Sequence, residues 1–375
     1  MSVYMFPGQG SQAKGMGAEL FELFPELTAT ANEILGYSIQ ELCLKDSEKQ
    51  LNNTRYTQPA LFVVNALAYR QRNRASSTRA DYLVGHSLGE YNALEASGAI
   101  RFEDGLKLVK KRGELMSAAP AGAMAAVIGL TETAVKEILQ THNLTSIDIA
   151  NLNSPTQTIL SGLKEDIIRA ASFFETGGAR YAPLNTSGAF HSRYMEAAQK
   201  EFEAYLKEFT FSTLSIPVIA NVNANPYQTE RIGAYLAAQI THPVQWTQSI
   251  QYLLTKGETL FEELGVGNVL TKLLTDIKKH PLPSATSQPD VTTPAMPERP
   301  AAMPHTDREQ ALAELQKKIN EWNHNYPIGT QVKTASLDRP IATKTQAMML
   351  FGHRAAIYLE GYNGYFELCD VQPAQ

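Results

Sequence analysis

Short apolar runs alternate with segments of helical hydrophobic periodicity along the first third of the chain. Residues 3–6 and 81–84 predict buried strands, and residues 60–64 are predicted to open a buried helix. Two more helices are predicted over residues 88–97 and 102–116. Strands and helices that alternate in this way are typical of a layered α/β fold.

The pattern changes over residues 123–186. Strands are predicted over 123–128, 146–150, 157–160 and 180–184, and helices over 131–140 and 164–174. This βαββαβ order is typical of a ferredoxin-like unit. We therefore expect a small subdomain at residues 123–186, inserted into a large subdomain formed by residues 1–122 and 187–280. The strand-like runs 216–221 and 259–264 belong to the large subdomain, and the cleft is expected between the two subdomains.

The C-terminal quarter has a different character. Residues 281–306 are rich in Pro, Ser and Thr, which predicts an extended linker. Thr306 and Glu309 form a capping-box pattern before a helical stripe of Leu312, Leu315, Ile319 and Trp322. Short strands are predicted at residues 331–333, 355–359 and 365–368, with a hairpin turn at Asn363-Gly364. Residues 307–375 are thus expected to form a helix and a small β module that serves packing or docking.

Composition narrows the class of protein. The chain has 375 residues, 43% of them hydrophobic, and a net charge of -5, which argues against general nucleic-acid binding. Its start lacks a basic segment followed by an apolar one, and no run of about 18 apolar residues occurs, so neither a signal peptide nor a membrane span is expected and the cytoplasm is the expected location. Cys43 and Cys369 have no metal or disulfide spacing and are expected to be buried thiols; no metal is expected.

The segment Gly85-His86-Ser87-Leu88-Gly89 carries the clearest chemical signal. A G-x-S-x-G pattern between a buried strand and a helix is typical of a nucleophile elbow, which exposes the serine Oγ above the sheet. The alternative is a glycine-flanked serine in an ordinary loop before a helix. The loop Gly8-Gln9-Gly10 allows main-chain N–H groups to approach a ligand, although a plain strand-to-helix loop would have the same composition.

A serine nucleophile needs a base, which is usually histidine. Among eight histidines, His191 is the best candidate because it lies where the chain re-enters the large subdomain. His86 is adjacent to Ser87 in sequence and is expected to point away from it. The other histidines are expected in loops or at the surface.

Seven motifs resemble those of the malonyl-CoA:acyl carrier protein transacylases, including the free-standing trans-acting acyltransferases of polyketide synthases. The resemblance covers roughly residues 1–275. In chain order the motifs are Phe6-Pro7-Gly8-Gln9-Gly10-Ser11-Gln12, Thr57-Gln58-Pro59-Ala60, Gly85-His86-Ser87-Leu88-Gly89-Glu90, Arg112-Gly113, Asn151-Leu152-Asn153-Ser154-Pro155, Gly188-Ala189-Phe190-His191-Ser192 and Pro243-Val244-Gln245-Trp246.

The resemblance implies an α/β-hydrolase-like large subdomain and a Ser–His dyad with ping-pong kinetics. Ser87 would take the acyl group as an ester, and His191 would move the proton. The main-chain carbonyl of Gln239 would orient His191, and the backbone N–H groups of Gln9 and Leu88 would form the oxyanion hole. Donors of this kind are worth about 3 to 4 kcal/mol each.

The resemblance also implies a substrate preference. Arg112 would lie in the cleft, where its planar fork can hold the free carboxylate of a malonyl group. On its own, Lys110-Lys111-Arg112 would instead indicate a solvated helix face. Phe190 is similar to the malonyl-type arrangement of the family, in which the aromatic ring crowds an α-methyl branch.

The sequence therefore predicts a malonyl-CoA:acyl carrier protein transacylase that acts in polyketide biosynthesis and needs no cofactor beyond its substrates. The phosphopantetheine is carried by the partner, and Lys107, Lys110 and Lys111 are candidates for a basic rim that docks an acidic carrier. The alternatives are a housekeeping fatty-acid transacylase, an acyl hydrolase that clears carrier proteins, and a catalytically silent scaffold. Arg112 argues against the hydrolase, and intact Ser87, His191 and Gln9 argue against the scaffold.

Overall fold

A four-stranded parallel sheet lies at the centre of the large subdomain, in a computed structural model that describes residues 2–76, 78–186, 188–280, 305–334, 340–350, 354–360 and 365–374. The strand order is β7-β2-β1-β8. The bounds are β1 Ser2–Phe6, β2 Tyr82–Gly85, β7 Val218–Ile219 and β8 Leu260–Glu263. Every neighbouring pair is parallel, as expected for a sheet covered by helices on both faces.

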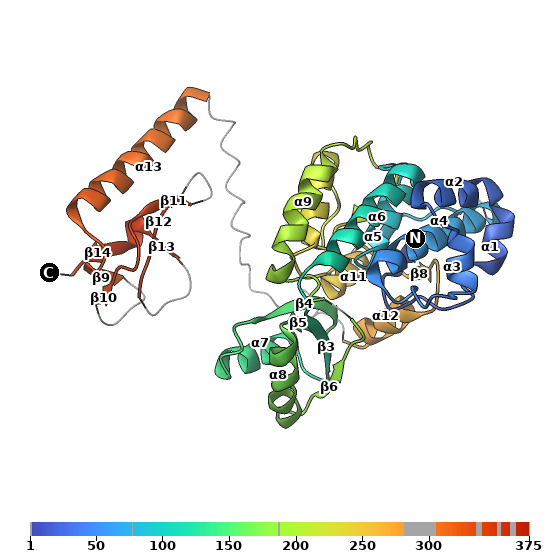
Figure 1. Cartoon of the computed structure of the whole chain (residues 1–375), viewed down its shortest axis with the longest axis horizontal. Helices are drawn as coiled ribbons and strands as arrows, with labels where there is room; N and C mark the ends of the chain where they lie inside the picture. The colour runs from blue at the N-terminus through green and yellow to red at the C-terminus, as the bar shows by residue number, and fades with distance from the viewer. Residues whose placement is uncertain are drawn as a thin grey trace. The chain divides into compact units, whose positions relative to one another are not determined.

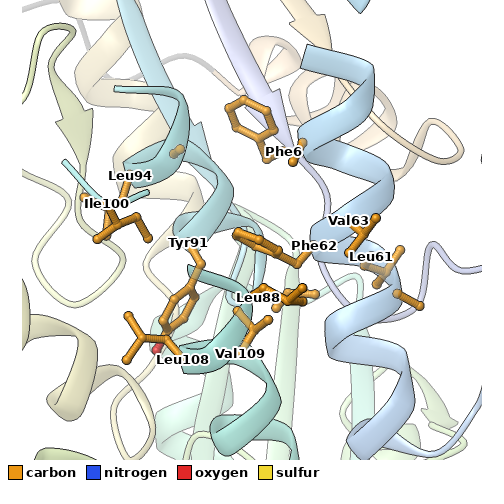
Figure 2. Packing of buried hydrophobic residues seen from close by; sticks show 14 of the residues in the cluster. Phe6, Leu61, Phe62, Val63, Leu88, Tyr91, Leu94, Ile100, Leu108 and Val109 are labelled. Atoms are coloured by element: carbon orange, nitrogen blue, oxygen red, sulfur yellow. The ribbon is translucent and has the colours of Figure 1, made fainter. Parts of the chain in front are cut away.

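Alternate residues of β1 pack into different cores. Tyr4 and Phe6 lie in a large cluster with helices α4, α5 and α6, whereas Val3 and Met5 pack with α11 and α12 on the opposite face. These helices span α4 Thr54–Ala75, α5 Gly89–Ala96, α6 Phe102–Ala118, α11 Trp246–Thr255 and α12 Val269–Lys279. Figure 2 shows Phe62 and Tyr91 among the buried side chains of the first cluster.

Further helices complete the large subdomain. They are α1 Ala18–Leu23, α2 Pro25–Leu35, α3 Ile39–Leu44, α9 Glu196–Leu206 and α10 Ile232–Gln239, with short 3-10 turns η1 Arg193–Met195 and η2 Thr229–Arg231. The predicted start of α4 was wrong: the helix begins at Thr54, not near residue 60, because the Asn53 side chain caps it and Pro59 lies within it.

The small subdomain has the predicted βαββαβ order. Its elements are β3 Ala123–Ile128, α7 Glu132–Thr141, β4 Ile147–Ser154, β5 Gln157–Gly162, α8 Lys164–Thr176 and β6 Arg180–Pro183. The antiparallel sheet has the order β4-β5-β3-β6, with α7 and α8 packed on one face (Figure 1). This is the ferredoxin-like topology, so the predicted fold class is confirmed.

Strand β4 is four residues longer at its end than predicted. Its polar second half, from Asn151, resembles a loop in sequence. Instead, Leu152 N–H donates to the Val244 carbonyl at 2.9 Å and Val244 N–H donates to the Ala150 carbonyl at 2.9 Å. These bonds to the large subdomain supply partners that a local sequence pattern does not reveal, and they tie the two subdomains together.

The C-terminal residues form a second compact unit, Ala285–Gln375, whereas Met1–Ser284 form the first. Its elements are α13 His305–Asn325, β9 Gln331–Thr334, β10 Ile341–Ala342, β11 Met348–Leu350, β12 Arg354–Tyr358, β13 Tyr365–Glu367, η4 Leu368–Asp370 and β14 Val371–Pro373. Ile319, Val332 and Ile357 are buried in its own core, with Trp322 packed against them.

The structure tests expectations about the start of α13 and about the two cysteines. Helix α13 begins at His305, so Thr306 lies inside the helix and not before it. Cys369 is exposed because it lies in the short turn η4 at the edge of a very small core, whereas Cys43 is buried as expected. The turn Asn363-Gly364 and most of the expected linker lie outside the described residues.

None of the described helices is long and apolar enough to cross a membrane.

Candidate active site

Ser87 stands on a strained turn between β2 and α5. Its φ is +51°, in the left-handed region that is costly for a residue with a side chain. Gly85 and Gly89 make the turn sterically feasible: a Cβ on Gly85 would lie 2.0 Å from the carbonyl carbon of Gly89, and one on Gly89 would lie 2.0 Å from the Phe6 carbonyl oxygen. This strand–turn–helix geometry is that of a nucleophile elbow.

His191 meets Ser87 from a segment 104 residues further along the chain. The distance from its Nε2 to Ser87 Oγ is 2.7 Å, and its Nδ1 lies 2.7 Å from the main-chain carbonyl oxygen of Gln239. That carbonyl fixes Nδ1 as the protonated nitrogen, which leaves Nε2 to accept the proton of Ser87. Burial, and then the nearby charge of Arg112, lower the pKa of His191 to about 3, so the imidazole is neutral near pH 7.

Two main-chain N–H groups near Ser87 lack a hydrogen-bond acceptor among the described residues. Gln9 and Leu88 both line the pocket that contains Ser87. Within the part of the chain that the structure describes, neither of their N–H groups donates a hydrogen bond. The loop around Gln9 comes close to the elbow, since a Cβ on Gly8 would lie 2.3 Å from the His86 carbonyl oxygen. Two unused donors beside a nucleophile can stabilise an oxyanion.

Arg112 on α6 is 1% exposed and lies beside the nucleophile. Its Nη2 donates to Ser87 Oγ at 3.1 Å and to Gln239 Oε1 at 2.8 Å, and its Nη1 donates to Gln58 Oε1 at 2.6 Å. Two neutral amide oxygens therefore hold the guanidinium in place without neutralising its charge. The pocket offers a fixed cation within reach of any group attached to Ser87.

The pocket around Ser87 has a volume of about 300 Å³ and is lined by both subdomains. Phe190, the residue before His191, forms part of its wall and is 5% exposed. Met124, Ile159 and Leu273 add apolar wall. The structure therefore brings together every residue that the sequence analysis placed at the site, from segments spread over most of the first unit.

Several residues around the elbow were missed by the sequence analysis. Asn221 Oδ1 accepts a hydrogen bond from Ser87 N–H at 2.8 Å, and its Nδ2 donates to the Gly85 carbonyl at 2.7 Å. Glu90, one turn after Ser87, is buried among hydrogen-bond donors. Gln58 and Glu90 stand in the quoted motifs, which was the available signal, but nothing local shows their partners.

The structure adds detail to two expectations about nearby side chains. His86 lines the Ser87 pocket, although its Nε2 pairs with Asn153 Oδ1 at 2.8 Å and not with Ser87. None of the three candidate lysines lines this pocket. Lys110 donates to the Ile34 carbonyl at 2.8 Å, and Lys111 pairs with Glu201 on α9 at 2.6 Å, because the outer face of α6 packs toward α2 and α9.

The described residues contain no group of three or more His, Cys, Asp or Glu side chains arranged to hold a metal ion. The groups that this pocket offers for chemistry are the Ser87–His191 pair, the main-chain N–H groups of Gln9 and Leu88, and the Arg112 guanidinium.

Comparisons with known proteins agree with this geometry. The family model described as "Acyl transferase domain" matches residues 3–303. The chain is 56% identical over 280 residues to the polyketide biosynthesis malonyl CoA-acyl carrier protein transacylase of Bacillus velezensis, covering 74% of this chain and 97% of that protein.

Solved structures give the same picture. The malonyl CoA-acyl carrier protein transacylase of Burkholderia pseudomallei is 49% identical, with a TM-score of 0.74 and coverage of 76% of this chain and 99% of that one. A malonyl-transacylase in complex with its type II polyketide acyl-carrier protein is 33% identical, with a TM-score of 0.71 and coverage of 74% and 93%.

Proposed function

Because the chain belongs to the acyl transferase domain family, we propose that it moves a malonyl group from coenzyme A to the phosphopantetheine thiol of an acyl carrier protein. Ser87 holds the malonyl group as an ester between the two half-reactions. The malonyl transacylases of similar sequence and the carrier-bound structure support this substrate and this partner.

In the first half-reaction, Ser87 Oγ attacks the thioester carbonyl while His191 Nε2 takes its proton. The N–H groups of Gln9 and Leu88 stabilise the negative oxygen of the tetrahedral intermediate. The intermediate collapses as the C–S bond breaks, and the sulfur of coenzyme A receives the proton from His191.

The second half-reaction reverses these steps with a different thiol. The carrier's phosphopantetheine sulfur gives its proton to His191 and attacks the Ser87 ester, and Ser87 leaves with the proton returned. Acyl exchange between oxygen and sulfur needs no electron transfer, so within this proposal no cofactor besides the two thiol substrates takes part.

The observation that carries the proposal is the buried guanidinium of Arg112, with Nη2 3.1 Å from Ser87 Oγ. Each terminal nitrogen has two N–H groups, and Gln58 and Gln239 take one from each. Of the other two N–H groups, the one on Nη2 donates to Ser87 Oγ in the structure. Acylation turns that oxygen into an ester, and the pair can then bind the two oxygens of the malonyl carboxylate. An acetyl group would leave this cation unpaired, which costs about 3 to 5 kcal/mol, or on the order of 10² to 10³ in selectivity.

We assign the reaction to a polyketide pathway in the cytoplasm, with the enzyme acting in trans. The support for the pathway is the named role of the Bacillus velezensis relative. The second compact unit, most of which follows the matched residues 3–303, fits an additional role in reaching a synthase.

Intact-protein mass spectrometry tests the proposal. The wild type, Ser87→Ala and Arg112→Ala are incubated with malonyl-CoA, acetyl-CoA or methylmalonyl-CoA, and holo carrier protein is then added. We expect a malonyl adduct that is absent in Ser87→Ala, weakened in Arg112→Ala and passed to the carrier. Failure to load malonyl, together with release of acyl groups from loaded carriers into water, would show a hydrolase instead.

A further inference from the structure

Glu90 is a buried carboxylate to which the mechanism above gives no role. It lies on α5, three residues after Ser87, and is 1% exposed. Its Oε1 accepts hydrogen bonds from Asn221 N–H at 2.8 Å and Tyr227 O–H at 2.9 Å, and its Oε2 accepts one from Gln239 Nε2. All three neighbours donate, which is the environment of an ionised carboxylate that only accepts.

The side-chain amide of Gln239 has only one orientation that satisfies its neighbours. Its Nε2 faces the Ser87 carbonyl oxygen at 2.8 Å and the Glu90 carboxylate, both of which are acceptors. Its Oε1 faces Arg112 Nη2 at 2.8 Å, which is a donor. A flipped amide would point its NH₂ group at the guanidinium and its oxygen at two other oxygens, losing every one of these bonds.

We infer that Glu90 is a positioning residue that fixes the side-chain amide of Gln239 and, through it, the orientation of Arg112 that selects a malonyl group. This inference rests on the proposed function. The Ser87 carbonyl alone also favours the same amide orientation, but a carboxylate is a stronger acceptor than a carbonyl. Glu90 is therefore the strongest of the acceptors that hold the amide with its oxygen toward Arg112.

The two roles of Gln239 are separable. Its main-chain carbonyl accepts from His191 Nδ1 at 2.7 Å, and flipping the side-chain amide leaves that carbonyl in place. A change at Glu90 should therefore disturb the recognition of the malonyl carboxylate by Arg112 while His191 still activates Ser87. A general loss of structure would disturb both.

The Glu90→Gln variant tests this directly because it keeps the size of the side chain. Its oxygen can still accept from Asn221 and Tyr227, so its NH₂ group faces Gln239 Nε2, removes that hydrogen bond and pushes the amide out of its place beside Arg112. Tyr227→Phe is the matched control: it removes a hydrogen bond to the same carboxylate but leaves the bond to Gln239. Both variants and the wild type are compared at a pH well above 7, where Glu90 is ionised.

Three rates are measured for each protein. Ser87 acylation by malonyl-CoA and by acetyl-CoA gives a ratio that reports carboxylate recognition by Arg112, and sulfonylation of Ser87 by phenylmethylsulfonyl fluoride reports the reactivity of Ser87 towards a reagent without a carboxylate. We expect the malonyl-to-acetyl ratio to fall about tenfold or more in Glu90→Gln, the usual effect of misplacing a hydrogen bond to a charged group. Sulfonylation should stay within about twofold of the wild type, and Tyr227→Phe should keep its ratio.

The wild type offers a second measurement that does not depend on a variant folding. Burial raises the pKa of Glu90 to about 7, even with its three donors. The charged and titratable groups that act on it are Arg112 on α6, Tyr227, and Tyr91 on its own helix. Below pH 7 a protonated Glu90 donates to Gln239, so the malonyl-to-acetyl ratio should fall with pH while sulfonylation does not.

An unchanged ratio in Glu90→Gln, or a ratio independent of pH in the wild type, would overturn the inference. Equal losses of acylation and sulfonylation, or an equal loss of selectivity in Tyr227→Phe, would also overturn it and show a structural role alone. If the wild type itself did not load malonyl, the proposed function would fail. If the wild type loaded malonyl and Glu90→Gln kept the wild-type ratio, only the inference about Glu90 would fail.

Discussion

Asp148 on β4 accepts hydrogen bonds from both the main chain and the side chain of Arg193. The Arg193 N–H lies 2.9 Å from Oδ2, and Nε lies 2.9 and 3.0 Å from the two carboxylate oxygens. Arg193 comes two residues after His191, whose φ of +56° is strained. The small subdomain therefore holds the segment that presents the His191 imidazole to Ser87.

Removing this contact in Asp148→Ala should slow Ser87 sulfonylation about three- to tenfold, because His191 is less well positioned. The thermal stability should change little, since a half-exposed ion pair contributes about 0 to 1 kcal/mol. Glu132→Ala, which breaks the exposed pair of Glu132 with Lys136 on α7, is the control and should keep the wild-type rate. Equal rates in both variants would contradict a positioning role for Asp148.

The pH dependence of the dyad follows from the lowered pKa of His191. Its value of about 3 keeps the base neutral well below the ordinary histidine pKa of about 6.5. Sulfonylation of Ser87 should therefore stay constant as the pH falls from about 8 to about 5. A rate that halves near pH 6.5 would show an ordinary, solvated imidazole.

The same shift predicts an effect on stability. Between about pH 6.5 and pH 3 the unfolded chain binds a proton at His191 and the folded chain does not, so the wild type loses up to about 1.4 kcal/mol per pH unit as the pH falls. Urea unfolding of His191→Gln should lack this loss. Its stability relative to the wild type should thus rise as the pH is lowered, and parallel curves would be inconsistent with a buried neutral imidazole.

Much of the fold was predictable because its signals are local. The elbow combines an apolar strand, two obligatory glycines and a helix within a short segment, and the βαββαβ order follows from hydrophobic periodicity alone. The second half of β4 was not predictable, because Asn151 and its neighbours are polar and find their partner at Val244. Long-range main-chain pairing leaves no periodic trace in either segment.

The residues of the site were likewise predictable only where a local motif indicates them. The residue types at Ser87 and His191 indicate their chemistry, and the family resemblance suggested the places of Gln239 and Arg112. The network behind them was missed because its bonds join residues 54 to 152 positions apart. His86 was expected to point away from Ser87; it lines the same pocket, and its Nε2 pairs with Asn153 and not with Ser87.

Phe190 gives a prediction about the size of the acyl group. Its ring lies in the wall of the Ser87 pocket, so Phe190→Ser should raise the methylmalonyl-to-malonyl loading ratio by about ten- to 150-fold, the usual value of one methyl group in a pocket. Because a buried Phe replaced by a small residue costs about 3 to 5 kcal/mol, Phe190→Leu serves as a milder variant with a smaller increase. A ratio unchanged in both folded variants would remove Phe190 from extender selection.

The C-terminal unit gives the last prediction. Its core of Ile319, Val332 and Ile357 contains no described residue of the first unit. The alignment of 280 residues covers 97% of the Bacillus velezensis relative. That relative therefore has almost no residues beyond the part that aligns with this chain. A chain ending at residue 280 should therefore transfer malonyl to a free-standing carrier within about twofold of the full-length rate.

Transfer to carrier domains inside the cognate synthase should fall about tenfold or more in the same truncated chain, if the second unit tethers the enzyme and raises its effective concentration there. Val332→Asp in the full-length chain keeps the second unit attached but should unfold it. Val332 is fully buried, and a buried unpaired charge should unfold that core. If the folded unit makes the contact, Val332→Asp should behave like the truncation on the synthase and like the wild type on the free carrier. If transfer to both carriers fell equally, the second unit would instead act by stabilising the first unit.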